Sequence, residues 1–361
     1  MKRAQVWIGM LGLVIASAAC SGDDSGSQPG GRGQVSIDQW PSAMADVLCD
    51  KLATCMPSTQ AMVMGGVDCR AHYTALLTDA AASLQSAIGK GTIIYHPDAM
   101  GACIAAMEAA GCADNDSESI PECRNALEGT VANGGDCTQS NECTDDGICI
   151  VTTSCPGKCM SRTPEGGACS SSSRCQSGLT CGNGKCVAPS THGQPCESSS
   201  CAGFMMCVGS PKTCKTESEI FVGAEGAGCD LNAFTLCQPG LVCRIGAIVG
   251  STYTAECAKP VSSGAACKLA FPEQCPVGEY CAGLDLQGGK VDGVCEPLPG
   301  DGQTCANTPD PMICAPETAC TGSTCKSLKH IGAACTSSYE CYSSACSSGK
   351  CISDDECPHA P

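Results

Sequence analysis

Cysteine is the residue type whose number and spacing in this sequence could do chemistry. The chain has 37 cysteines among 361 residues. Thiolates at C-x2-C spacing bind zinc or exchange disulfides. No two cysteines here stand at that spacing, and the closest pair is Cys155 and Cys159. Because exported proteins oxidise such cysteines in pairs, we expect structural disulfides rather than a metal centre or a redox site, and no cofactor.

Histidine offers little further chemistry. The five histidines are His72, His96, His192, His330 and His359, and none belongs to an HExxH motif or accompanies a G-x-S-x-G turn. No glycine-rich phosphate loop follows a strand signal, and a Cys–His pair needs a thiol that oxidation removes. We therefore expect no enzyme, and no catalytic residue.

Three acidic segments could bind calcium weakly. Residues 114–118 begin like a calcium loop, but Ser119 and Asn125 stand where the loop needs glycine and glutamate. We expect a solvated loop there, and solvated turns at residues 145–146 and 354–356. Weak calcium binding is left open. The net charge of −17 disfavours nucleic acid and anionic headgroups as partners.

One cysteine pattern occurs seven times and organises residues 131–361. Each copy opens with Gly-x-x-Cys, and six copies place five residues between the second and third cysteine, while the seventh places four. The other gaps vary, so we expect a stapled frame that carries adjustable loops, with turns and short strands between the staples. The opening glycine predicts a positive φ. The copies span about 134–159, 166–186, 193–214, 226–257, 264–295, 302–325 and 332–357.

Four cysteines in each copy allow three connectivities, and the spacing does not choose between them. We favour first-to-third and second-to-fourth, because interlaced loops compact so short a unit. The sets are Cys137, Cys143, Cys149 and Cys159; Cys169, Cys175, Cys181 and Cys186; Cys196, Cys201, Cys207 and Cys214; Cys229, Cys237, Cys243 and Cys257; Cys267, Cys275, Cys281 and Cys295; Cys305, Cys314, Cys320 and Cys325; and Cys335, Cys341, Cys346 and Cys351. The partners of Cys155 and Cys357 stay open.

Copies four and five carry long inserts before their last cysteine. Residues 244–256 and 282–294 are each predicted to form a hairpin, turning at residues 250–251 and 288–289. These hairpins are the candidate binding elements, and the candidate contact residues are Ile248, Tyr253, Leu286 and Lys290.

Residues 34–130 have helical rather than repeat character. Apolar spacing predicts helices from Trp40 to Cys55, from a cap at Asp68 to about Ile88, from Pro97 to Met107 and from Pro121 to Leu127. Six cysteines fall in this part, an even set that can close on itself: Cys49, Cys55, Cys69, Cys103, Cys112 and Cys123. We expect a small helical bundle with three disulfides.

The N-terminus reads as an export signal. A basic head and the apolar run of residues 6–15 predict a signal peptide over residues 1–19. Cys20 follows small residues and is the predicted lipidation site, after which residues 20–33 form a flexible acidic Gly/Ser tether. Lipidation of Cys20 would leave 36 cysteines, an even number. Plain secretion with a free Cys20 is the alternative.

The lipobox-like start, the six-cysteine helical part and the Gly-x-x-Cys array together resemble cysteine-rich lipoproteins of the myxobacterial type. The single units are similar to the Dickkopf N-terminal and EB-like modules. The fold class is thus a small disulfide-rich one, in which an α-helical disulfide-bonded bundle precedes a linear array of seven small β/turn modules. The resemblance implies an outer-membrane or cell-surface lipoprotein that binds or adheres to a surface protein or glycan. The alternatives are an envelope spacer without a ligand, or an inhibitor of secreted proteases.

Overall fold

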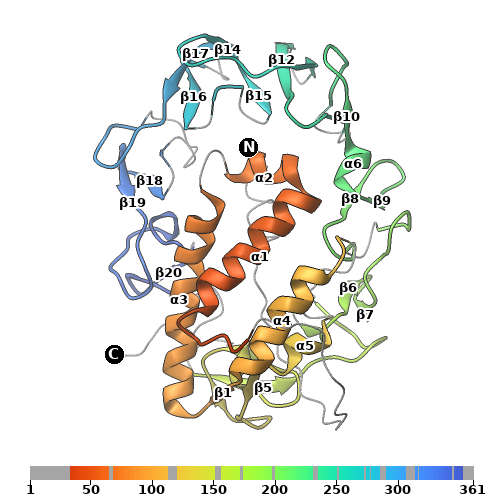
Figure 1. Ribbon diagram of the computed structural model, residues 1–361, viewed down its shortest axis with the longest axis vertical. Helices are drawn as coiled ribbons and strands as arrows, with labels where there is room; N and C mark the ends of the chain where they lie inside the picture. Colours follow the sequence, from red (N-terminus) through yellow and green to blue (C-terminus); the bar gives the residue numbers. More distant parts are fainter. Residues whose placement is uncertain are drawn as a thin grey trace. The chain divides into compact units, whose positions relative to one another are not determined.

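The computed structural model describes residues 33–352 except 65–67, 113–119, 151–155, 171–173, 197–199, 231–234, 250–251, 272–273, 277, 285–289, 306–313, 316 and 344 (Figure 1). The predicted signal peptide, Cys20 and the tether up to residue 32 lie outside the described residues. Cys155, Cys357, residues 114–118 and residues 354–356 do so too.

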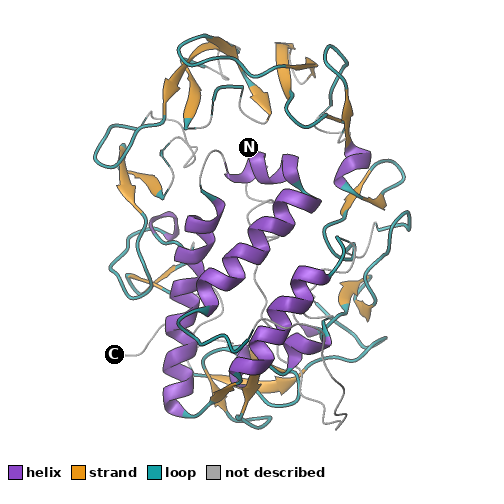
Figure 2. Ribbon diagram, in the orientation of Figure 1, coloured by secondary structure: helices purple, strands orange, loops and turns teal. Residues whose placement is uncertain are grey.

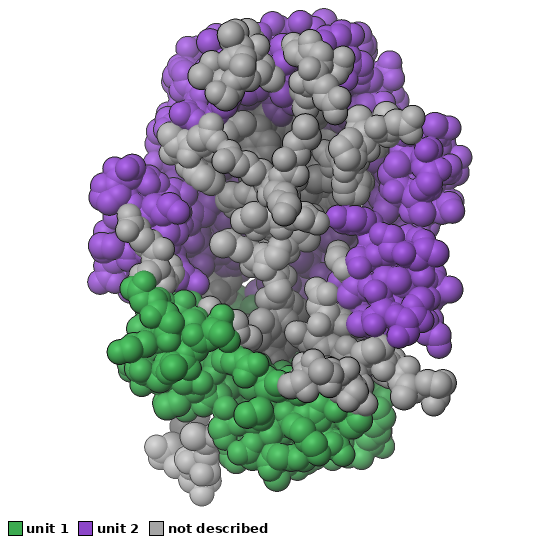
Figure 3. All heavy atoms as spheres, turned by 180° about the vertical axis from the view of Figure 1, so that it is seen from behind, with its two compact units in different colours: residues 1–36, 84–110, 115–188 green, residues 37–83, 111–114, 189–361 purple. Residues whose placement is uncertain are grey.

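The chain divides into two compact units (Figure 3). Unit 1 holds residues 1–36, 84–110 and 115–188, and unit 2 holds residues 37–83, 111–114 and 189–361. Helix α3 (Cys69–Lys90) contributes residues to both. The predicted domain boundary near residue 130 separates two kinds of sequence, and it stays a prediction.

Unit 1 combines short helices with a two-stranded sheet. Helix α4 (Pro97–Ala109) begins at a proline, and its buried residues recur at helical spacing. Helix α5 (Pro121–Arg124) is shorter than predicted. It ends early because strand β2 (Leu127–Gly129) pairs with strand β1 (Ile93–Tyr95), a contact between distant segments that no local pattern announces.

Unit 2 begins with three helical segments. Helix α1 (Trp40–Cys55) has the predicted bounds, and Trp40 at its start is fully buried. Helix α2 (Pro57–Met64) was not predicted. The predicted cap of α3 is present, since Asp68 Oδ1 accepts a hydrogen bond from the Ala71 N–H at 2.8 Å. Unit 2 holds the disulfides Cys49–Cys69 and Cys55–Cys112, and unit 1 holds Cys103–Cys123, which joins α4 to α5.

The seven modules consist of short strands and turns (Figure 2). In unit 1 the elements are β3 (Asp136–Cys137), η2 (Ser140–Glu142), β4 (Gly147–Ile150), β5 (Gly157–Ser161), β6 (Thr180–Gly182) and β7 (Lys185–Val187). In unit 2 they are β8 (Met206–Val208), β9 (Thr213–Lys215), α6 (Glu217–Ile220), β10 (Phe221–Gly223), β11 (Leu236–Cys237), β12 (Val242–Val249), β13 (Thr252–Ala258), β14 (Ala266–Lys268), β15 (Ala270–Phe271), β16 (Glu279–Ala282), β17 (Asp292–Pro297), β18 (Thr318–Thr321), β19 (Thr324–Ser327), η5 (Ser338–Glu340), β20 (Cys346–Ser347) and β21 (Lys350–Cys351).

Every module has the same two crossed disulfides. The first cysteine bonds the third and the second bonds the fourth in all seven copies, which is the connectivity that the sequence analysis favoured. In five copies the buried cluster at the centre of the module consists of these cysteines. Each bond closes a short loop and contributes about 3 kcal/mol in the chain-entropy account. The disulfides thus replace a hydrophobic core.

The third and fourth cysteines of each copy face each other across an antiparallel strand pair. The pairs are Cys149 with Cys159, Cys181 with Cys186, Cys207 with Cys214, Cys243 with Cys257, Cys281 with Cys295, Cys320 with Cys325, and Cys346 with Cys351. The residues between them therefore form the end of a hairpin. A hairpin can lengthen without disturbing either disulfide, which explains why this gap varies most.

The opening glycine of each module lies in the left-handed region, as predicted. Its φ ranges from +69° at Gly264 to +87° at Gly332. In six copies its N–H donates to the carbonyl of the last cysteine, for example from Gly166 to Cys186 at 2.7 Å. This turn brings the start of the module against its final strand.

Gly166→Ala tests the turn. No heavy atom lies within 4 Å of a Cβ added at Gly166, so the cost is backbone strain alone. We expect the variant to lose about 1–2 kcal/mol of copy-two stability. The matched control is Gly89→Ala in helix α3, which also has open space but no positive φ and should gain up to about 1 kcal/mol. Thermal unfolding of both full-length variants checks this, and equal midpoints would contradict it.

Candidate functional site

The hairpin of copy four is the longest strand pair among the described residues. Strands β12 and β13 pair in antiparallel register from Val242 with Ala258 to Val249 with Thr252, and the register shifts once near Ala247. This confirms the predicted hairpin over residues 244–256. Its turn at residues 250–251 lies outside the described residues.

Copies four and five share one sheet. Strand β15 of copy five pairs with β12, Cys243 opposite Phe271 and Arg244 opposite Ala270. A further hydrogen bond runs from the Ile245 N–H to the Leu269 carbonyl at 2.8 Å. Three strands hold the copy-four hairpin more firmly than an isolated pair could. Backbone hydrogen bonds between β12 and β15 therefore join copy four to copy five.

The second insert does not form the long hairpin that was predicted. Strand β17 pairs with β16 only from Ala282 opposite Val294 toward the chain's C-terminal side. Its first residues pair instead with β14 of the same module, Lys268 opposite Asp292. Strand β17 thus lies between β14 and β16, with one of them on each edge. Residues 285–289, with the predicted turn and Leu286, lie outside the described residues.

The four candidate contact residues are spread over both copies. Ile248 and Tyr253 stand opposite each other in the copy-four hairpin. The Tyr253 hydroxyl donates to Asp230 Oδ1 at 3.1 Å, which ties the hairpin to its own module. Lys290 is exposed in copy five. The copy-four pair is therefore the better-defined candidate.

An ion pair supports the base of the hairpin. Arg244 donates to Glu256 directly across the two strands. Opposite charges at facing positions stabilise a strand pair modestly. At the module junction before it, Phe221 is buried with Val208, Ile220 and Leu236 rather than offered for contact.

Carboxylate and amide oxygens serve as acceptors inside the modules. The residue before the second cysteine accepts a hydrogen bond from the backbone N–H that follows the first cysteine in copies one, five and seven. The side chain of Glu142 accepts from the Thr138 N–H, that of Gln274 from the Lys268 N–H, and that of Glu340 from the Thr336 N–H. This contact braces the loop between the first two cysteines. The sequence pattern did not predict it, because the contact becomes visible only in the folded module.

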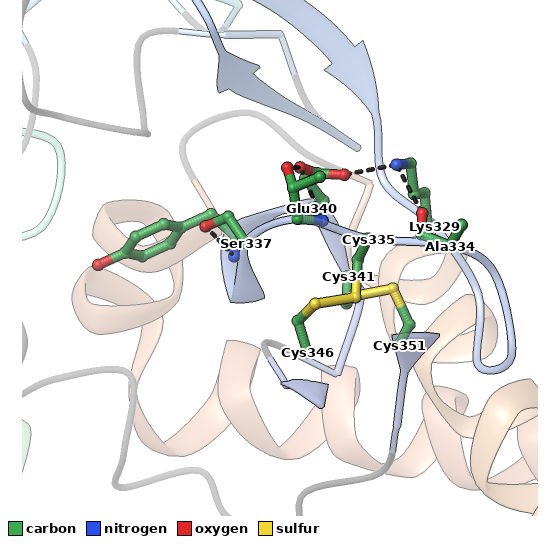
Figure 4. Close-up of polar contacts among 10 residues, drawn as sticks. Lys329, Ala334, Cys335, Ser337, Glu340, Cys341, Cys346 and Cys351 are labelled. Carbon is green, nitrogen blue, oxygen red and sulfur yellow. Dashed lines mark hydrogen bonds and ion pairs between the residues drawn. A yellow bond between two sulfur atoms is a disulfide. The ribbon is translucent and has the colours of Figure 1, made fainter. Parts of the chain in front are cut away.

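Glu340 pairs with a cation as well as with neutral donors (Figure 4). Lys329 Nζ donates to Glu340 Oε2 and also to the Ala334 carbonyl, the latter at 2.8 Å. The Thr336 hydroxyl and N–H both donate to Oε1. The Lys329 ammonium and then Thr336 lower the pKa of Glu340 to about 2.

Asp146 corrects the expectation of a solvated turn at residues 145–146. Both residues of the turn have a φ of 55°. The Asp146 carboxylate accepts hydrogen bonds from the Ser177 N–H at 2.9 Å and the Ser177 hydroxyl at 2.6 Å, and it pairs with Arg162 at 3.3 Å. It thereby joins copy one to copy two. Both oxygens of the Asp146 carboxylate accept hydrogen bonds within the protein.

Three described histidines pair with carboxylates. They are His96 with Glu128 at 3.0 Å, His192 with Glu219 at 2.8 Å and His330 with Asp79 at 2.8 Å. In the His192 group the Glu219 carboxylate lies between the ring and the Thr216 hydroxyl. A nucleophilic triad needs the histidine in the middle, so this order does not activate the hydroxyl. The Thr216 N–H and then His192 lower the pKa of Glu219 to about 2.

Sulfur atoms also gather within the modules. Three cysteine sulfurs of a module lie within 4.8 Å of one another, for example in Cys137, Cys143 and Cys159. Cys143 and Cys159 are bonded to each other, and Cys137 is bonded to Cys149. Metal binding needs thiolates, whereas these sulfur atoms are bonded to one another in crossed disulfides. Disulfides on this scale form in an oxidising compartment, which fits an extracellular or cell-surface protein.

Among the helices in the described part of the chain, none combines the length and the apolar character that a membrane span requires.

The chain is similar to cell-cell adhesion glycoprotein 64 of Heterostelium pallidum, with 27% identity over 219 residues. The similarity covers 58% of this chain and 63% of that protein. No protein-family model matches the chain, and no solved structure matches it. The likeness to Dickkopf and EB-like modules therefore stays a prediction.

The pKa of Glu340 predicts how copy seven responds to acid. A carboxylate whose pKa falls from 4.5 to about 2 stabilises the folded module above pH 4.5, and this contribution is lost as the pH falls to 2. We expect a phosphine reductant to open Cys335–Cys346 and Cys341–Cys351 increasingly fast over that range. Peptide mapping by mass spectrometry measures the rates.

Copy two supplies the baseline, because Arg174 occupies the equivalent position there. In the Glu340→Gln variant, the two copy-seven disulfides should be reduced faster than in wild type at pH 6. Their reduction rates should change little between pH 4.5 and 2. A wild-type copy-seven profile that runs parallel to that of copy two would show that the carboxylate does not brace the module.

Proposed function

We propose that this chain is a non-enzymatic cell-surface adhesion protein that presents hairpins on a disulfide-stapled array. The observation that carries the proposal is the sheet shared by copies four and five, from which the copy-four hairpin extends. Binding loops on a rigid scaffold are a common way to place contact residues at low entropic cost. The similarity to an adhesion glycoprotein supports the same assignment.

The arrangement of polar groups also favours a binding role over catalysis. The described carboxylates that are buried bond to backbone N–H groups, as Glu142 and Glu340 do. The histidine pairs are partly or largely exposed and lack an adjacent activated nucleophile. Such groups hold the fold together and leave recognition to the loops.

We further propose that a lipid anchors the protein. A lipid on Cys20, followed by the tether of residues 20–33, would hold the protein at the outer membrane or cell surface. The basis is the sequence around Cys20 and the odd number of cysteines. The partner would be a surface protein or glycan, because the net charge of −17 disfavours nucleic acid.

Cutting back the copy-four hairpin tests the binding site. Residues 244–256 are replaced by the four residues that join the same cysteines in copy two, Gly182–Lys185. Protein-coated beads are then applied to intact cells that make the protein. We expect the attachment of the beads to fall at least about tenfold. A tenfold fall corresponds to the loss of one contact worth about 1.4 kcal/mol.

A second variant keeps the hairpin length and changes only its contact residues, Ile248→Thr with Tyr253→Thr. The control makes the matched cut in copy five, over residues 282–294. Attachment at the wild-type level by both copy-four variants would discard this hairpin as the adhesive element. Disulfide content measured by mass, before and after reduction, shows that each variant has folded.

Cys20→Ser tests the anchor. We expect the variant to leave the membrane fraction, because a single apolar leader that is cleaved cannot retain the protein. A protease-cleavable tag after His359 reports exposure: loss of the tag from intact wild-type cells indicates an outward-facing array. Retention of Cys20→Ser in membranes would contradict lipidation, and a tag protected until the envelope is broken would contradict surface display.

A further inference from the structure

Unit 2 contains a contact in which an acidic side chain from the modules occupies the start of a helix. Glu217 lies in α6, between copies three and four, and is 3% exposed. Its carboxylate accepts hydrogen bonds from the backbone N–H groups of Ser58 at 2.6 Å and Thr59 at 3.2 Å. Both donors belong to the first turn of α2, where N–H groups lack helical partners and the helix dipole favours an anion.

Copy three is fixed to the same place by a second hydrogen bond. The Phe204 N–H donates to the Cys112 carbonyl at 3.0 Å. Cys112 is bonded to Cys55, the last residue of α1, two residues before α2 begins. The middle of copy three is therefore held where α1 meets α2.

A second buried carboxylate fixes the start of copy seven, this time from the helix side. Asp79 of α3 is 7% exposed and accepts hydrogen bonds from His330 Nδ1 at 2.8 Å and the Ile331 N–H at 3.2 Å. The His330 ring stacks on Tyr342 of copy seven, with 4.9 Å between ring centroids. Again one carboxylate joins two donors across a contact between distant parts of the chain.

The segment between these two contacts consists of copies four, five and six. Each copy is stapled by its own disulfides, and copies four and five share a sheet. Backbone hydrogen bonds continue the series, from Leu328 to Glu317 at 2.8 Å and from Lys329 to Glu340 at 2.7 Å. The segment is thus internally braced. The contacts that hold it to the helices are non-covalent: the two at its ends, and an electrostatic interaction between Glu317 of copy six and His72 of α3.

We propose that the Glu217 and Asp79 contacts form a releasable closure that holds copies four to six against helices α2 and α3. When both contacts open, the three modules leave the helices together, and no disulfide breaks. Release lengthens the reach of the array from the helices that hold it. This device goes beyond adhesion, and its test requires no adhesion partner.

Isosteric variants test the closure, because an amide removes the negative charge and replaces one of the two accepting oxygens with an N–H donor. The full chain is compared by small-angle X-ray scattering as wild type, Glu217→Gln, Asp79→Asn and the double variant. We expect each single variant to stay close to wild type, since the other contact remains. The double variant should have a radius of gyration about a fifth larger, because three modules move away from helices α2 and α3.

The controls are Glu219→Gln and Asp50→Asn. Glu219 lies in α6 as Glu217 does, but it bonds to Thr216 and His192 within the array. Asp50 lies in the helices and pairs with the exposed Arg70. A double variant with all disulfides and the wild-type radius would overturn the proposal, and so would equal expansion of the controls.

Amide exchange provides a second test that needs only a single variant. If both contacts close the same segment, Glu217→Gln should lower the protection of the Ile331 N–H by about tenfold, the size of an ordinary coupling between two sites. Glu219→Gln should leave that protection unchanged. An Ile331 N–H that exchanges equally in wild type and Glu217→Gln would show that the contacts act independently, and would contradict a shared closure.

Discussion

The crossed pair of disulfides in each module is the constraint on which the rest of the structure depends. Few large apolar residues lie between the cysteines, so the loops could not hold a fold by burial. Linking the first cysteine to the third and the second to the fourth fixes four points of the chain within one small volume. The final strand pair, with its two facing cysteines, then has a defined position whatever the length of its hairpin.

That constraint separates the frame from the loops. Copy two joins its last cysteines by a tight turn with Asn183 and Gly184 in the left-handed region, whereas copy four joins them by strands β12 and β13. The same disulfides serve both. A chain built in this way can vary one hairpin for recognition while its stability rests on neighbouring bonds, which suits a protein that presents contacts rather than performs chemistry.

Carboxylates provide the second level of organisation. Glu340 braces a module, Asp146 joins two modules, and Glu217 joins a module to a helix. In each case the oxygens accept hydrogen bonds from backbone N–H groups, among the strongest that a protein offers when the acceptor is charged. The acidic composition therefore does more than repel anionic partners, because it supplies acceptors for N–H groups that the short strands leave unpaired.

Local patterns allowed much of the frame to be predicted. The Gly-x-x-Cys spacing indicated the positive φ of residues such as Gly166, and apolar spacing indicated helix α1. The copy-four hairpin followed from the length and polarity of its insert. The copy-five strand pair is shorter than predicted and stops at Ala282 opposite Val294. The end of α5 failed similarly, since β2 is drawn to β1.

The sequence by itself determined the module count and the disulfide-stapled character of the fold, because cysteine spacing is a property of the chain alone. Only the tertiary structure decided the connectivity, the sheet shared by copies four and five, and the roles of Asp146, Glu217 and Asp79. These depend on residues far apart along the chain, such as Asp79 and His330. The residue type alone does not show whether an acidic side chain is solvated or is a buried acceptor. The hydrogen-bond donors around it distinguish the two cases.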